Sequence, residues 1–183
     1  MSEETASIVV LFAHPTAYRS RVNKVLFKRI SNVAGVLARD LYELYPDFNI
    51  DVETEQRILR EADLVVFQHP IYWYSAPPIV KEWIDVVFKR GFAYGPGGNA
   101  LQGKDMLLVC STGGSPEAYS SSGRHGYPLN ELIRPLQQTA RFCGMNFLEP
   151  LVLYSGRAAS EAQLNDHAQR YRELLTNYQS HDR

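Results

Sequence analysis

The sequence has few cysteines, no excess of basic residues and no long hydrophobic run. Its two cysteines, Cys110 and Cys143, are too few for a disulfide scaffold, so we expect a cytoplasmic protein. Nineteen Lys and Arg against twenty Asp and Glu give a net charge of -1, and no cationic surplus is left for binding nucleic acid. The longest apolar run, Ile8–Ala13, is far shorter than the ~20 residues of a membrane-spanning helix. The polar start, MSEETAS, predicts no signal peptide.

Aromatic side chains, by contrast, are abundant. Eleven Tyr, eight Phe and two Trp make up 11% of the 183 residues, and apolar residues make up 45%. This composition is typical of a globular protein and excludes a disordered chain. The length predicts a single domain, 1–183. The positions of the rings along the chain are therefore informative about its function.

Short apolar runs alternate with amphipathic stretches along the chain. The runs predict strands over 7–13, 36–42, 63–68, 105–110 and 146–155. The amphipathic stretches predict helices over 20–32, 53–62, 77–88, 129–143 and 159–178. This alternation predicts an α/β fold, a flavodoxin-like doubly wound five-stranded parallel sheet in the order 2-1-3-4-5. Ligands of such sheets bind beyond the carboxyl ends of the strands, so the loops that follow the strands are the places to search.

The loop after the first predicted strand has the features of an anion site. It begins at His14 and leads into a predicted helix at Ser20, Arg21, Val22 and Asn23. Backbone N–H groups at a helix N-terminus, with hydroxyl, amide and imidazole side chains beside them, suit a phosphate. An ordinary helix capped by Ser20, with a surface histidine, explains the same residues.

The loop after the third predicted strand places three rings in a row. Ile71 precedes Tyr72, Trp73 and Tyr74, and prolines bound the segment. Such a run is suited to a flat apolar ligand. Packing of the rings at the sheet edge or at an oligomer interface is the alternative.

The loop after the fourth predicted strand starts with small residues that allow close backbone approach to a ligand, namely Ser111, Thr112, Gly113 and Gly114. Tyr119 and His125 follow in the same loop, and a phenol and an imidazole can together donate to a developing oxyanion. Solvated side chains without a ligand are the alternative. Phe92, Tyr94 and Tyr127 lie in neighbouring loops and are expected to join this site.

Several partial motifs do not support a site. Gly98–Asp105 nearly spells a phosphate-binding loop, but Asp105 stands where a Ser or Thr is needed. Gly95–Ala100 fits a dinucleotide-binding pattern without the strand and helix that should flank it. The histidines lack metal-ligand spacing, so we expect no metal site. The two thiols are expected to be buried and inert.

Four segments, taken together and in order, carry a family resemblance: LFAHP, ADLVVFQHPIYWYSAPPIVKEWIDVVF, STGGSPEAYSSSGRHGYP and CGMNFLEPLVLYS. They resemble the NAD(P)H:quinone oxidoreductase family of flavodoxin-like flavoproteins. LYELYPDFNIDVETEQ and GFAYGPGGNALQGK resemble in particular the bacterial ancillary proteins of glutathione-gated potassium-efflux systems.

The resemblance implies FMN, or FAD, bound by His14, by residues 20–23, 71–74 and 111–114, with Tyr119 and His125 as the catalytic pair. It implies ping-pong hydride transfer from NAD(P)H through the flavin to a quinone. It also implies a homodimer, and a potassium-efflux antiporter as partner at the cytosolic face of the inner membrane. Arg124 stands where an aliphatic residue is common in the family. A non-catalytic regulatory subunit and a flavodoxin-type electron carrier are the alternative functions.

Overall fold

The computed structural model describes residues 8–178. Its strands are β1 (Ile8–Phe12), β2 (Val36–Asp40), β3 (Leu64–Pro70), β4 (Asp105–Ser111), β5 (Asn146–Phe147) and β6 (Leu151–Leu153). They form one sheet in the order β2-β1-β3-β4-β5, and β6 also pairs with β4. All five pairings are parallel. The predicted α/β class and doubly wound strand order are therefore confirmed.

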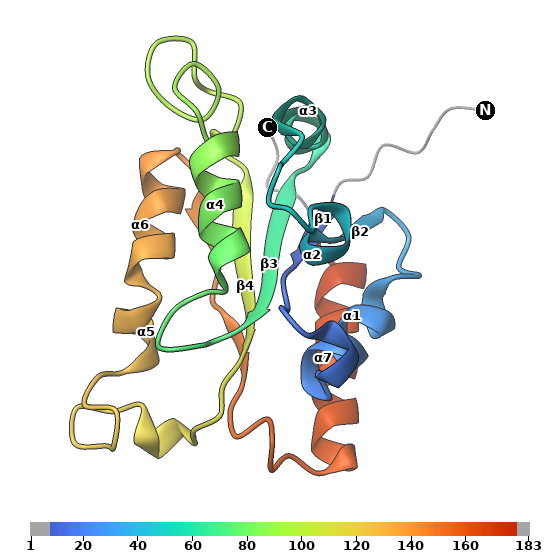
Figure 1. Ribbon diagram of the computed structural model, residues 1–183, viewed down its shortest axis with the longest axis vertical. Coiled ribbons are helices and arrows are strands. Elements are labelled where there is room, and N and C mark those ends of the chain that lie inside the picture. Colours follow the sequence, from blue (N-terminus) through green and yellow to red (C-terminus); the bar gives the residue numbers. More distant parts are fainter. Residues whose placement is uncertain (1–7, 179–183) are drawn as a thin grey trace.

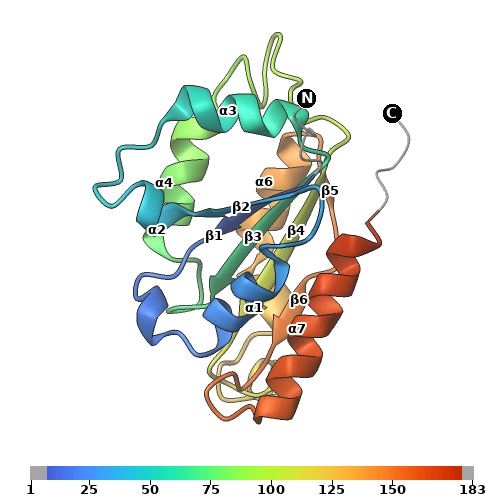
Figure 2. The same ribbon diagram turned by 90° about the vertical axis from the view of Figure 1, so that its right-hand side faces the viewer.

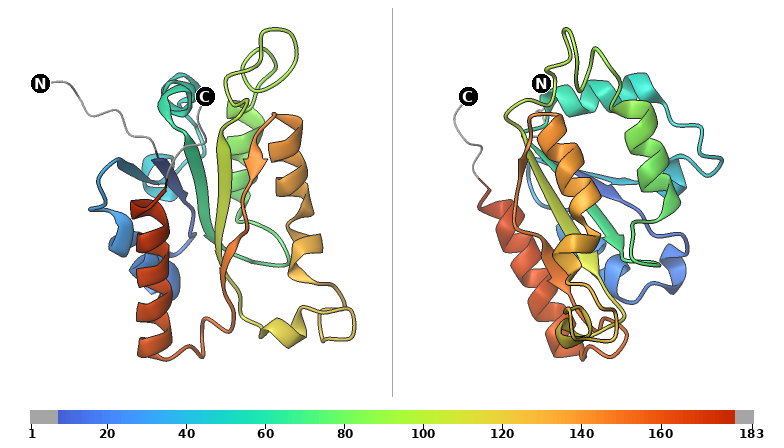
Figure 3. Two further views of the ribbon diagram at one scale, coloured as in Figure 1. Left: turned by 180° about the vertical axis from the view of Figure 1, so that it is seen from behind. Right: turned by 90° about the vertical axis from the view of Figure 1, so that its left-hand side faces the viewer.

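Helices cover both faces of this sheet (Figure 1). They are α1 (Val22–Ile30), α2 (Leu41–Leu44), α3 (Val52–Glu61), α4 (Pro78–Val87), α5 (Leu129–Leu132), α6 (Arg134–Phe142) and α7 (Glu161–Thr176). Two short 3-10 turns, η1 (Ala17–Arg19) and η2 (Pro116–Ala118), lie in the strand-end loops. Helices α1 and α7 lie side by side on one face (Figure 2), where the Arg172 guanidinium donates to the Arg29 carbonyl over 2.9 Å. Helices α4 and α6 cover the other face (Figure 3).

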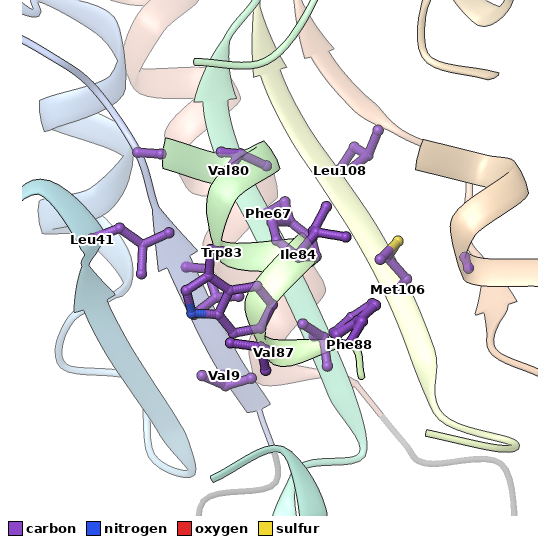
Figure 4. Packing of buried hydrophobic residues seen from close by; sticks show 14 of the residues in the cluster. Val9, Leu41, Phe67, Val80, Trp83, Ile84, Val87, Phe88, Met106 and Leu108 are labelled. Atoms are coloured by element: carbon purple, nitrogen blue, oxygen red, sulfur yellow. The ribbon is translucent and has the colours of Figure 1, made fainter. Parts of the chain in front are cut away.

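The two faces of the sheet bury separate apolar clusters. Along β3, Val65 and Phe67 belong to the cluster beneath α4, whereas Leu64 and Val66 belong to the cluster beneath α1 and α7. The fully buried Trp83 of α4 packs its ring edge-on against Phe67, with 5.6 Å between ring centroids (Figure 4). Burial on both faces explains why β3 is almost continuously apolar in sequence.

Two predicted elements are each divided into two shorter ones. The strand expected over 146–155 is two short strands, because Pro150 lies between β5 and β6 and has no N–H for a ladder. The helix expected over 129–143 is also two helices, α5 and α6. Pro135 lies in the first turn of α6, where a missing N–H is tolerated, and Ile133 separates the two helices.

The strand expected over 36–42 ends at Asp40. The Asp40 carboxylate accepts hydrogen bonds from the backbone N–H groups of Tyr42 (3.1 Å) and Glu43 (3.3 Å). This N-cap starts the short helix α2 directly after β2, which the alternating pattern did not reveal.

The loop over 91–103 lies at the opposite end of the sheet from the loops that follow the strands (Figure 1). A crossover helix such as α4 runs antiparallel to the strands and returns the chain to the end where the strands start. Phe92 is buried there under the Arg60 guanidinium, and the Tyr94 ring contacts Phe142. The expectation that Phe92 and Tyr94 join the site was therefore wrong. Within residues 8–178, no helix is long and apolar enough to cross a membrane.

Candidate functional site

The loops that follow β1, β3, β4 and β6 enclose a cavity of about 430 Å³ at the carboxyl ends of the strands. Small-molecule sites typically have volumes of about 300 to 1,000 Å³. The predicted cofactor residues that line the cavity are His14, Ser20, Arg21, Val22, Asn23, Ile71, Tyr72, Ser111, Thr112 and Gly113. The doubly wound topology thus brings together three segments that are far apart in the sequence.

The start of α1 forms one wall of the cavity. The Ser20 hydroxyl accepts a hydrogen bond from the Asn23 backbone N–H over 3.1 Å, as its predicted capping role requires, although Ser20 lies one residue before Arg21, the N-cap residue of α1. The Asn23 side-chain amide donates to the Ser111 hydroxyl over 2.8 Å and so joins α1 to the end of β4. Asn23 is only 2% exposed, and its Oδ1 atom has no hydrogen-bond partner in the described chain. The wall therefore contains a buried acceptor that a ligand can satisfy.

His14, in the loop after β1, is hydrogen-bonded to Tyr72, in the loop after β3. Its Nδ1 accepts from the Thr16 backbone N–H over 3.2 Å, so in the neutral ring the proton is on Nε2. Nε2 lies 3.0 Å from the Tyr72 hydroxyl and donates to it. Burial lowers the pKa of His14, which favours this neutral form.

The cavity is cationic. Arg19 and Arg157 line it, and neither has an ion-pair partner within residues 8–178. Arg21 is instead paired with Glu161 (2.6 Å) and also donates to the Ala159 carbonyl over 2.6 Å. No Asp or Glu of the described chain lines the cavity. This charge distribution favours an anionic ligand.

The three consecutive rings lie on a tight turn. Tyr72 and Ser75 exchange backbone hydrogen bonds of 2.9 and 3.0 Å, so that Trp73 and Tyr74 are the two central residues. Their φ angles of 48° and 66° lie in the left-handed region, which glycine and asparagine usually occupy in such a turn. Strained backbone of this kind is concentrated at ligand sites.

The rings of this turn do not share one environment. Tyr72 lines the cavity and Tyr74 contacts the His125 ring edge-on, with 5.5 Å between centroids. Trp73 is 93% exposed and lies away from the cavity wall. Through Tyr74, the turn at residues 72–75 therefore contacts the loop that contains Tyr119 and His125.

Tyr119 and His125 lie against each other, with ring centroids 4.4 Å apart and ring planes inclined by 33°. Tyr119 is 9% exposed, and burial raises its pKa, so its phenol stays protonated at neutral pH. The His125 backbone N–H donates to the Ala118 carbonyl over 3.0 Å, which closes the loop and brings the imidazole back to Tyr119. The phenol and the imidazole thus lie together, and both can donate hydrogen bonds.

Gly114 lies directly against this pair. A Cβ atom built there would be 2.8 Å from His125 Nε2 and 3.1 Å from a Tyr119 ring carbon. The absence of a side chain at Gly114 is therefore what allows the two rings to lie so close to the loop. Gly114, Trp73, Tyr74, Tyr119 and His125 are the predicted site residues that do not line the cavity itself.

The cavity also has lining residues that sequence reasoning missed: Thr16, Arg19, Pro70, Gly156 and Arg157. The first three lie within the loops that follow the first and third predicted strands. Gly156 and Arg157 come just after the last predicted strand, so the rule that ligands bind after strand ends would have found them. Both buried thiols, Cys110 and Cys143, lie outside the cavity wall, and their predicted burial is confirmed.

Comparison with known proteins adds to this geometry. Residues 6–175 match a family model described as flavodoxin-like fold. The chain is 42% identical to the glutathione-regulated potassium-efflux system ancillary protein KefG of Escherichia coli, over 97% of this chain and 96% of KefG.

Solved structures give a similar result. A chain in the crystal structure of a thermophilic tryptophan halogenase from Streptomycin violaceusniger is 42% identical, with a TM-score of 0.90, covering 93% of this chain and 99% of that chain. General stress protein 14 of Treponema denticola, solved in complex with FMN, is 32% identical with a TM-score of 0.84, covering 92% and 95%. An NADPH-quinone reductase from P. pentosaceus is 28% identical with a TM-score of 0.86, covering 94% and 99%.

Proposed function

Because this chain belongs to the flavodoxin-like fold family, we propose that its cavity binds FMN, with FAD as the alternative, and that the protein is an NAD(P)H:quinone oxidoreductase. Two structural relatives support the proposal: one was solved in complex with FMN and one is an NADPH-quinone reductase.

The observation that carries the proposal is the cationic cavity at the start of α1. A flavin mononucleotide ends in a phosphate, and the unpaired Arg19 and Arg157 are the residues that would hold it, together with the Ser20 hydroxyl. The buried, unpartnered Oδ1 of Asn23 suits a hydroxyl donor of the ribityl chain. Charge, hydrogen-bonding capacity and volume of the cavity therefore all fit the cofactor.

When bound, the flavin would supply the redox chemistry, by accepting a hydride from NAD(P)H and passing two electrons to a quinone in ping-pong order. The protein would supply hydrogen-bond donors to the negative charge that develops. The backbone N–H groups of Gly113 and Gly114 donate to no other group within residues 8–178. The protonated phenol of Tyr119 and the imidazole of His125 are the other donors, and Tyr72 and Tyr74 would limit access of water.

The role proposed for His125 is tested by His125→Ala, with the exposed Ser122→Ala of the same loop as the matched control. We expect quinone turnover with NADPH to fall about 100-fold in His125→Ala, a typical contribution of one general acid or base. FMN affinity should stay unchanged, because His125 does not line the cavity. Equal turnover in the two variants would show that His125 has no catalytic role.

Similarity to KefG favours a second role for the same protein. We propose that it also binds a potassium-efflux antiporter as an ancillary subunit, as a homodimer, at the cytosolic face of the inner membrane. Tyr119→Phe separates the two roles, because it removes a donor at the site and changes no exposed surface. Co-purification of this variant with antiporter-containing membranes would support an ancillary role that does not need the redox site. Loss of that association would contradict such a role.

A further inference from the structure

One buried titratable residue has no part in the proposed function. His69 is near the end of β3 and is 0% exposed. Its register partner on β4 is Cys110, so it points to the same face of the sheet as Val65 and Phe67, two residues that pack beneath α4. An imidazole on an otherwise apolar face requires an explanation, because an unsatisfied polar group in such a place is costly.

Both ring nitrogens of His69 have partners in the neutral form. Nδ1 lies 2.9 Å from the Pro70 carbonyl oxygen, which can only accept, so Nδ1 carries the proton. Nε2 lies 3.9 Å from the Cys110 sulfur and can accept from its thiol. The arrangement thus defines one tautomer, with the N–H directed at the Pro70 carbonyl.

The Pro70 carbonyl needs this donor because the sheet does not provide one. In the ladder between β1 and β3, the Ala13 N–H donates to the Gln68 carbonyl over 2.9 Å. If this ladder continued by two residues, the N–H of residue 15 would donate to the Pro70 carbonyl. Residue 15 is a proline and has no N–H. The imidazole of His69 takes the place of the missing backbone donor.

The peptide that joins Pro70 to Ile71 is consequently held on both sides. Its carbonyl accepts from His69, and its N–H, that of Ile71, donates to the Ser111 carbonyl over 2.8 Å. The strained turn that presents Trp73 and Tyr74 begins directly after this peptide. We infer that His69 is the positioning residue that anchors this turn beside the cavity, through the hydrogen bond from Nδ1–H to the Pro70 carbonyl.

Four variants test the inference. His69→Asn retains an N–H near the position of Nδ1, whereas His69→Gln places its amide near the position of Nε2. His69→Leu removes both, and Cys110→Ala removes the thiol. The measurement is amide hydrogen exchange, without flavin, at Tyr72 and Ser75, whose N–H groups close the turn. The reference is the Asp105 amide at the far end of the sheet, which donates to the Asp63 carbonyl.

Relative to Asp105, exchange at Tyr72 and Ser75 should rise about threefold to tenfold in His69→Leu and His69→Gln, as expected for loss of one hydrogen bond. It should stay within about twofold of wild type in His69→Asn and Cys110→Ala. The inference is overturned if Gln protects the turn as well as Asn does, or if Cys110→Ala exposes it. Should His69→Leu not fold, the comparison of Asn with Gln decides.

A second measurement rests on the proposed function: FMN affinity should weaken in the variants whose turn exchanges faster. Because the exchange experiment contains no flavin, it tests His69 even if the wild-type protein binds none. If exchange in the turn rises but FMN affinity does not change, His69 does anchor the turn. The same result would show that the turn does not contribute to cofactor binding.

Discussion

At the scale of single residues, Gly114 controls how closely Tyr119 and His125 approach the loop after β4. A Cβ atom at Gly114 would lie 2.8 Å from His125 Nε2 and 3.1 Å from a Tyr119 ring carbon, so the imidazole would have to shift. A Cβ atom at Gly113 would meet no protein atom within 4 Å and would enter the cavity that Gly113 lines. Neither glycine has a positive φ angle, so the difference between them is one of contact and not of backbone strain. A substitution at Gly114 therefore acts on the Tyr119–His125 pair, whereas one at Gly113 would act on the cavity itself.

Gly114→Ala should displace the Tyr119–His125 pair. We expect kcat for quinone reduction to fall between about tenfold and 100-fold, because a displacement of about 1 Å at a reacting group is enough for such a loss. The exposed Ser122→Ala, in the same loop but away from the cavity wall, should keep kcat within about twofold of wild type. Steady-state kinetics of the two flavin-loaded variants check this, and equal rates would show that the contact at Gly114 is unimportant.

His69 also makes the stability depend on pH. Burial lowers the pKa of His69 to about 4, from 6.5 in the unfolded chain. The unfolded chain therefore binds more protons between these values, so the stabilisation is complete above pH 6.5 and is lost as the pH falls towards 4. Between pH 7.5 and pH 5, this group alone should lower the free energy of unfolding by roughly 2 kcal/mol.

Urea unfolding of wild type and His69→Asn at these two pH values measures this contribution. Asparagine does not titrate, so the variant should lose roughly 2 kcal/mol less than wild type on acidification. An equal loss in both proteins would mean that His69 does not carry the effect. The comparison isolates this residue from the other buried histidines, His14 and His167, whose pKa values are also lowered by burial.

At the scale of elements, the turn at residues 72–75 places aromatic rings beside the cavity, and its two left-handed residues lower the stability of the fold. Replacing Trp73 and Tyr74 by Asn and Gly provides the residues that this turn geometry prefers. We expect the free energy of unfolding to rise by about 1 to 2 kcal/mol, because two strained backbone conformations are relieved. The same variant should weaken flavin binding and quinone turnover, because Tyr74 no longer contacts His125.

Thermal or urea denaturation, together with flavin titration, checks both halves of this expectation. A variant that is no more stable than wild type would mean that the turn is not strained. A variant that is more stable and also binds flavin normally would show that the rings of this turn have no part in the site. Phe142→Ala, at an exposed ring that does not line the cavity, serves as a control for the loss of aromatic surface.

The elements differ in how well the sequence predicts them. Strand β3 was predictable because burial on both faces leaves a continuous apolar run, and the start of α1 was predictable from Ser20. The interruption of the last strand was predictable from Pro150, whereas the pairing of both halves with β4 is not revealed by periodicity. The left-handed conformation of Trp73 and Tyr74 has no local signal at all, since tertiary contacts impose it against the preference of these residues.

At the scale of the whole molecule, the doubly wound topology determines which loops share a site. Alternation of strands and helices predicted that the loops after β1, β3 and β4 lie at one end of the sheet, and the cavity is lined by all three. The same rule explains why Phe92 and Tyr94, after α4, lie at the other end. Arg157 also follows a strand, β6, but no local sequence motif marks it as a cavity residue.

The central claim for this protein is that the cavity at the strand ends is a flavin site. The most direct measurement is the visible absorbance spectrum of the purified protein, after incubation with FMN and removal of free FMN by gel filtration. We predict flavin absorption bands that co-elute with the protein, are bleached by NADPH under anaerobic conditions and return on addition of a quinone. A spectrum without flavin bands after incubation with FMN, and equally after FAD, would contradict the central claim.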